Sequence, residues 1–228
     1  MQRYRSLFLS DIHLGSIHCK SEALFELLEN VRVENLFLVG DIITQNAKAS
    51  HPDIVRFKEL INSRDWNIVY ILGNHEKERK AKQVKLSTTN IFKTYNAYVY
   101  DNGQKRIYLT HGDIFHQKDI FQKLLKLILV KVKKSAQKIE TKRKTHTAST
   151  LYHLKIKPFL QKILHNAYLE YMTSLAKKHD AQVVICGHIH LPERIVKNHI
   201  IYLNCGDWIN HTSFIAEDEA GKFHLIAR

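Results

Sequence analysis

The chain has 228 residues, of which 44% are hydrophobic, and its formal net charge is +13 at pH 7. This size allows one domain with a core of normal size, and no run approaches the roughly 20 apolar residues that a membrane-spanning helix needs. Three cysteines cannot all pair with one another, and they lack the CxxC spacing of a structural zinc site.

The positive charge indicates an anionic partner. A field of this sign attracts phosphates, nucleic acid or an anionic membrane face, and a solvated lysine-rich surface is the alternative. Arg3 and Arg5 place charge near the amino terminus, and no signal-type apolar region follows them. We therefore expect a cytoplasmic protein with reduced cysteines.

The first half of the chain alternates strand and helix patterns. Apolar runs at residues 7–9, 36–39 and 68–72 predict buried strands. Between them, Ser21 begins a stretch with apolar residues at helical spacing, and Pro52 begins a second one. This alternation predicts a largely parallel sheet with helices on its faces.

The second half of the chain has hairpin patterns instead. The tight-turn sequence Asp101-Asn102-Gly103 separates two short apolar runs. A further strand is expected at residues 183–186, and two more hairpins are expected at residues 194–203 and 214–226. These strands predict a second sheet that packs on the first.

Residues 116–179 have no strand character and form a predicted helical insertion. Apolar residues at helical spacing alternate with many lysines between residues 120 and 138, and a second helical segment restarts at Pro158. One interpretation is a helical hairpin whose apolar faces bury each other. The other is a cap over the site that receives a lipid-like substrate, with its lysines on an anionic membrane surface.

Five of the predicted strands end in residues that bind metals. Because parallel strands end at the same edge of a sheet, we expect these side chains to meet at one place. Glycine beside most of them fits tight turns in which backbone passes close to a bound ion. The candidate ligands are Asp11, His13, Asp41, Asn74, His111, His188 and His190.

This ligand set points to a two-metal site. Mixed oxygen and nitrogen ligands without thiolate suit Mn²⁺, Fe²⁺ or Zn²⁺. Seven groups are too many for one tetrahedral ion, and they fit two octahedral ions that share a bridging carboxylate. Two metals about 3.5–4 Å apart polarise a phosphoryl group and lower the pKa of a water held between them.

The blocks DIH, GD, GNHE, HGD and GHIH follow one another from Asp11 to His190, and this series resembles the calcineurin-like metallophosphoesterase superfamily. The resemblance implies an α/β fold, a four-layer αββα sandwich of two mixed sheets flanked by helices. It also implies a single domain over residues 1–228, with a helical-hairpin cap inserted at residues 116–179.

The same resemblance implies a role for each ligand. Asp11, His13, Asp41 and His190 would hold one metal, and Asp41, Asn74, His111 and His188 would hold the other. Asp41 is then the bridge. His75 matches the histidine that the family uses to stabilise the transition state or to protonate the leaving oxygen.

A closer likeness is to the UDP-2,3-diacylglucosamine pyrophosphatases of lipid A synthesis. It rests on residues 187–193, residues 202–208 and the basic helical insertion. It implies cleavage of a diphosphate to a lipid sugar phosphate and UMP, two Mn²⁺ ions, and peripheral contact with the inner face of the cytoplasmic membrane. The chain departs from that group at His75, where the established enzymes carry arginine, and at Glu76, where they carry aspartate.

Two other functions stay open. A phosphodiesterase or nuclease that acts on nucleotides or nucleic acid would use the same core and the same positive charge. The other is a binding scaffold that has kept the fold and lost catalytic activity, and the complete ligand set argues against it. Near the ligand turns, Arg79 and Arg194 are candidate contacts for a second phosphate or a carboxylate, as is Lys77, and solvent-facing charges are the alternative.

Overall fold

The computed structural model describes residues 2–78, 93–115, 130 and 157–227. The chain divides into two compact units, one formed by Met1–Asp113 with Thr173–Arg228 and the other by Ile114–Met172. All strands of the described residues belong to the first unit.

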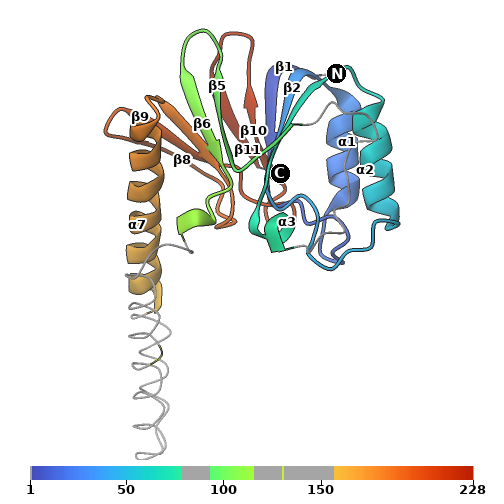
Figure 1. Cartoon of the computed structure of the whole chain (residues 1–228), viewed down its shortest axis with the longest axis horizontal. Coiled ribbons are helices and arrows are strands. Elements are labelled where there is room, and N and C mark those ends of the chain that lie inside the picture. Colours follow the sequence, from blue (N-terminus) through green and yellow to red (C-terminus); the bar gives the residue numbers. More distant parts are fainter. Residues whose placement is uncertain (1, 79–92, 116–129, 131–156, 228) are drawn as a thin grey trace, which may run out of the picture. The chain divides into compact units, whose positions relative to one another are not determined.

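The first unit contains a six-stranded mixed sheet with the strand order β11-β10-β1-β2-β3-β4 (Figure 1). Strands β1 to β4 are parallel to one another, and β10 and β11 continue the sheet in antiparallel pairing. The strands are β1 (Gln2–Leu9), β2 (Val31–Val39), β3 (Asn67–Ile71), β4 (Lys93–Tyr95), β10 (Ser213–Glu217) and β11 (Phe223–Ala227).

Strands β1 and β2 begin several residues before their apolar runs. The last four residues of each strand are all buried. The earlier residues are exposed or partly buried in β1, and in β2 they alternate between buried and exposed. A strand end that projects past the covered part of a sheet needs no apolar run, so sequence periodicity missed these starts. The short elements β4 and α3 (Asn74–Glu78) were not predicted either.

Helices α1 (Ser21–Asn30) and α2 (Pro52–Asn62) cover one face of this sheet (Figure 1). Both begin where the sequence predicts, and Pro52 stands at the first turn, where its missing N–H costs nothing. Arg56 of α2 joins the two helices, because its guanidinium pairs with Glu22 and Glu29 of α1 at 3.0 and 3.1 Å. The same group lies 4.1 Å above the Phe25 ring.

The second sheet has five strands in the order β5-β6-β7-β9-β8. Strands β6, β7 and β9 are parallel, and β5 and β8 pair antiparallel at its two edges. The predicted tight turn joins β5 to β6, where Asp101 Oδ1 accepts a 2.9 Å hydrogen bond from the Gly103 N–H. The strands are β5 (Ala97–Asp101), β6 (Arg106–Thr110), β7 (Val183–Cys186), β8 (Glu193–Lys197) and β9 (Ile200–Asn204).

The two sheets pack face to face. Phe8 of β1 stacks on Phe37 of β2 at 4.7 Å between ring centroids, and both belong to a buried cluster that also contains Ile107, Val183 and Leu203 of the second sheet. A second cluster lies between the first sheet and its helices. Two mixed sheets flanked by helices confirm the predicted α/β sandwich.

Helix α7 (Lys157–Lys178) runs from the second unit into the first. In the first unit, Thr173 and Ala176 are buried, and the Tyr108 ring of β6 stacks on His179 at 4.6 Å. In the second unit, the ring of Phe115 meets that of Tyr168 edge-on at 5.3 Å.

The predicted helical hairpin lies mostly outside the described residues, so the insertion at 116–179 and its role as a cap stay predictions. Within the described ranges, no helix is long and apolar enough to cross a membrane.

Candidate metal centre

The seven predicted ligands follow strands of both sheets, all within the first unit. Asp11 and His13 come after β1, Asp41 after β2, and Asn74 after β3 at the start of α3. From the second sheet, His111 follows β6, and His188 and His190 follow β7. The site therefore lies at the carboxyl ends of parallel strands, where open α/β sheets bind their ligands.

The ligand turns hold an uncommon backbone conformation. Nine non-glycine residues of the described ranges have positive φ angles, and five of them are predicted ligands. Side chains disfavour this left-handed region, and residues held in it concentrate at functional sites. The five angles are 51° at Asp11, 56° at His13, 52° at Asp41, 71° at His188 and 56° at His190.

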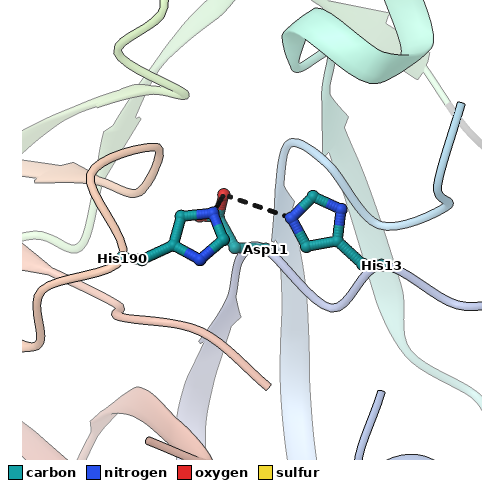
Figure 2. Close-up of side chains that lie close together, drawn as sticks. All are labelled: Asp11, His13 and His190. Atoms are coloured by element: carbon teal, nitrogen blue, oxygen red, sulfur yellow. Dashed lines mark ion pairs between the residues drawn. The ribbon is translucent and has the colours of Figure 1, made fainter. Parts of the chain in front are cut away.

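Three ligands from the first and fifth turns meet in one group (Figure 2). The Nε2 atoms of His190 and His13 lie 3.2 and 3.9 Å from Oδ1 of Asp11. Asp11 Oδ1 and His13 Nε2 are both buried, and neither has a hydrogen-bond partner. Buried polar atoms are rarely left in this state, so a cation at this position would satisfy both.

The second group is centred on His111. Its Nδ1–H donates to the Val39 carbonyl at 3.0 Å, so its Nε2 is the atom that faces the site. That Nε2 lies 3.4 Å from Asp41 Oδ2 and 3.3 Å from Asn74 Oδ1. The ring of His188 meets that of His111 edge-on at 5.1 Å. The structure thus brings the seven predicted ligands together around Asp11 and Asp41.

The geometry allows three overlapping metal-binding groups among the described residues. They are Asp11 with His13 and His190, Asp11 with Asp41 and His111, and His13 with Asp41 and His75. In each group the potential ligand atoms lie within 4.8 Å of one another. Asp11, His13 and Asp41 each belong to two of the groups, so the groups share their ligands.

Charge in the metal-free site is shared between buried carboxylates and imidazoles. Burial disfavours the charged form of His111, but Asp11 and Asp41 outweigh it and raise its pKa to about 9. Asp11 and Asp207 act in the same way on His190, whose pKa rises to about 10 against the effect of burial. The pKa of Asp41 lies below its usual range, because the nearby histidines outweigh the effect of burial.

Glu76 was not predicted as part of the site, and it holds two ligand turns together. Its Oε2 accepts hydrogen bonds from the N–H groups of Asp41 and Gly73, both at 2.9 Å. Its Oε1 accepts from Ile42 at 2.8 Å and Ile43 at 3.2 Å. In the sequence, the only sign of this role is that the block GNHE ends in an acidic residue.

Lys77 was predicted as a contact for a phosphate or a carboxylate, or as a solvent-facing charge, and in the structure it pairs with a carboxylate of the protein. Its Nζ donates to both carboxylate oxygens of the buried Asp113, at 2.9 and 2.8 Å. This pair ties α3, which carries Asn74, to the turn that carries His111. The charge of Lys77 is therefore used inside the protein.

Two glycines allow the ligand turns to approach each other closely. A side chain at Gly40, whose φ is 84°, would collide with the ring of His111, and one at Gly73 would collide with Asp41. Both glycines are needed for the close approach of one ligand turn to another, and Gly40 is also needed for the positive φ of its turn.

A cavity of about 360 Å³ opens at the ligands. His75 lies on its wall, with Nε2 3.8 Å from Asp41 Oδ2. Its Nδ1 accepts a 3.1 Å hydrogen bond from the Gln45 N–H, so the proton of the neutral ring is on Nε2. The lining residues are His13, Ser16, Asp41, Thr44, Asn74, His75, His188, His190 and Ile209.

Of the two predicted substrate contacts, the structure describes only Arg194, and Arg194 does not line this cavity. Arg194 is exposed on the edge strand β8. Arg79 lies outside the described residues, so its role stays a prediction.

Comparisons with known proteins agree with this geometry. The family model described as calcineurin-like phosphoesterase matches residues 4–192. No curated protein sequence matched the chain significantly.

Solved structures share the fold. A novel archaeal phosphodiesterase is 16% identical, with a TM-score of 0.53 over 98% of this chain and 99% of that chain. Yfce, a phosphoesterase from E. coli, is 16% identical, with a TM-score of 0.50 over 97% and 98%. Vacuolar protein sorting 29 from Cryptosporidium parvum is 14% identical, with a TM-score of 0.52 over 98% and 95%. At these identities the likeness shows the fold alone.

Proposed function

The chain belongs to the calcineurin-like phosphoesterases, and from this premise we propose that it hydrolyses a phosphate ester or diphosphate bond with two divalent ions. Asp11, His13, Asp41 and His190 would hold one ion. Asp41, Asn74, His111 and His188 would hold the other.

The observation that carries this proposal is the pair of buried atoms without hydrogen-bond partners, Asp11 Oδ1 and His13 Nε2. A cation would satisfy an oxygen and a ring nitrogen left in this way, and the other donors nearby are also oxygen and nitrogen. This donor set fits Mn²⁺, Fe²⁺ or Zn²⁺, and we propose Mn²⁺ for the active form. When bound, two such ions polarise the phosphoryl group and lower the pKa of a water.

His75 is the candidate general acid. Because Gln45 donates to its Nδ1, the neutral ring presents the Nε2–H to the cavity, next to Asp41. A proton at that atom can pass to the oxygen that leaves phosphorus, and an imidazole suits this role near neutral pH. The fixed Nδ1 contact keeps the ring in the orientation that this transfer needs.

Variants of His75 and Asp41 test the proposal. We expect H75A to lower kcat on a nucleotide phosphodiester, whose alkoxide leaving group needs a proton, by about 10²–10⁴-fold while it keeps both Mn²⁺ ions. D41N should lose activity and bound metal together. H18A, which removes an exposed imidazole from the loop after His13, is the matched control. Loss of an ion in H75A would instead make His75 a ligand, and full activity in D41N would refute the bridging role.

For the substrate we propose a lipid-linked nucleotide diphosphate of the UDP-2,3-diacylglucosamine type. Support comes from the sequence likeness at residues 187–193 and 202–208 and from the basic insertion, which would contact an anionic membrane face. His75, in the place of the arginine of that group, favours a second candidate, a phosphodiesterase or nuclease that acts on nucleotides or nucleic acid.

One assay separates the two candidates. Mn²⁺-loaded protein is given UDP-diacylglucosamine in detergent micelles, simple nucleotide diesters and single-stranded DNA, and the products are followed by phosphorus NMR. Release of UMP supports the first candidate. Preferred cleavage of DNA, with an affinity that falls steeply with salt, would replace it with the second.

A further inference from the structure

Asp207 is a fully buried carboxylate that follows β9. Its Oδ1 accepts hydrogen bonds from three N–H groups in succession, those of Ile209 at 2.9 Å, of Asn210, and of His211 at 3.1 Å. Its Oδ2 lies 3.3 Å from Nδ1 of His190 and 3.0 Å from Nδ1 of His211. One oxygen is therefore held by backbone, and the other faces two imidazoles.

The two nitrogens of His190 face two different carboxylates. Nδ1 faces Asp207 Oδ2 at 3.3 Å, and Nε2 faces Asp11 Oδ1 at 3.2 Å. A carboxylate accepts hydrogen bonds, so a single proton on this ring is held best at the nitrogen that faces the carboxylate outside the candidate metal-binding groups. Asp11 belongs to two of the candidate metal-binding groups, whereas Asp207 belongs to none of those found among the described residues, so the proton belongs on Nδ1.

We propose that Asp207 is a positioning residue that holds His190 in the tautomer with a bare Nε2, the form that binds a metal. The inference rests on the proposed metal site. The backbone contacts of Asp207 also fix the turn that carries Ile209, which lines the cavity. Asp207 thus fixes the tautomer of a candidate metal ligand and the position of a residue that lines the cavity.

The isosteric variant D207N tests this role. The asparagine oxygen can keep the three backbone hydrogen bonds, but its NH₂ would face His190 Nδ1 and favour the proton on Nε2. We expect Mn²⁺ to bind one of the two sites about 10–100-fold more weakly, and the other site to be unchanged. At saturating Mn²⁺ most of the activity should return, because no group in contact with substrate has been removed.

The chain offers a matched control in a second aspartate-histidine pair. Asp218 Oδ2 lies 2.7 Å from His224 Nε2, and Asp218 Oδ1 accepts from the Lys222 N–H at 2.9 Å, in the turn between β10 and β11. D218N should leave both Mn²⁺ affinities unchanged. Equal affinities in D207N and the wild type, or equal losses in D207N and D218N, would overturn the proposal.

A second measurement needs no variant of Asp207 and decides the matter if D207N does not fold. In full-length protein labelled with ¹⁵N-histidine and loaded with ¹¹³Cd²⁺, the His190 signals are those absent from H190N. We expect cadmium coupling at Nε2 and an attached proton at Nδ1. Coupling at Nδ1 would overturn the proposal, whereas a wild-type protein that binds neither Mn²⁺ nor Cd²⁺ would overturn the proposed function itself.

Discussion

Replacing Glu76 with glutamine should destabilise the protein strongly, although the change is isosteric. The carboxylate accepts four backbone N–H groups, two on each oxygen. Glutamine keeps one accepting oxygen, so two N–H groups lose their acceptor and face the NH₂ group instead. A buried N–H without an acceptor costs about 1–3 kcal/mol.

The expected loss for E76Q is about 3 kcal/mol, because these N–H groups are partly buried and the lower half of that range applies to each. For a chain of this length, 1 kcal/mol shifts Tm by about 2–4 °C, so Tm should fall by roughly 6–12 °C. Calorimetry on metal-free protein with a chelator present measures the loss without a contribution from weaker metal binding.

The control for E76Q is E26Q, which removes the charge of an exposed glutamate on α1 and should leave Tm unchanged. If E76Q melts within about 2 °C of the wild type, the four hydrogen bonds do not hold the two ligand turns together.

Two further predictions concern charge. K77M removes the ammonium partner of the buried Asp113 and should lower the free energy of unfolding, measured in urea, by about 3 kcal/mol. The double variant K77M/D113N should restore most of this loss. If K77M is as stable as the wild type, the ion pair does not stabilise the protein. Because His111 and His190 have pKa values raised to about 9 and 10, both should carry protons in the metal-free protein at pH 8. Loading Mn²⁺ should then release about two protons, measured by calorimetry in buffers of different ionisation enthalpy, and release of none would contradict this. The same raised pKa values stabilise the metal-free fold fully below pH 6.5, and this contribution is lost as pH rises through 9 and 10.

The ligand positions could be predicted because their signal is local. A carboxylate or imidazole directly after an apolar strand, as at Asp41 and His111, is visible in a few residues, and parallel pairing brings such strand ends together. The helices α1 and α2 were predictable for the same reason, since the apolar spacing is contained within each segment. A side-chain cap did not help at α1, because its N-cap is Lys20, whose side chain makes no capping hydrogen bond.

The contacts that hold the ligands in place could not be predicted, because the partners are distant in sequence. Glu76 acts on amides more than 30 residues away, and Lys77 reaches Asp113 on the other sheet's turn. Within its own segment, each is an ordinary charged residue of a short helix. Asp113 and Asp207 follow glycines in turns, and this position indicates a group that supports a ligand or caps the backbone, but the contact of Asp207 with His190 depends on how β7 and β9 pair.

The left-handed turns of the site have a consequence for the stability of the fold. His13, His188 and His190 hold a backbone conformation that costs a residue with a side chain roughly 1–2 kcal/mol each. Glycine at these positions would avoid this cost, but it would supply no donor atom. The protein thus spends fold stability on side chains that only the cation site needs.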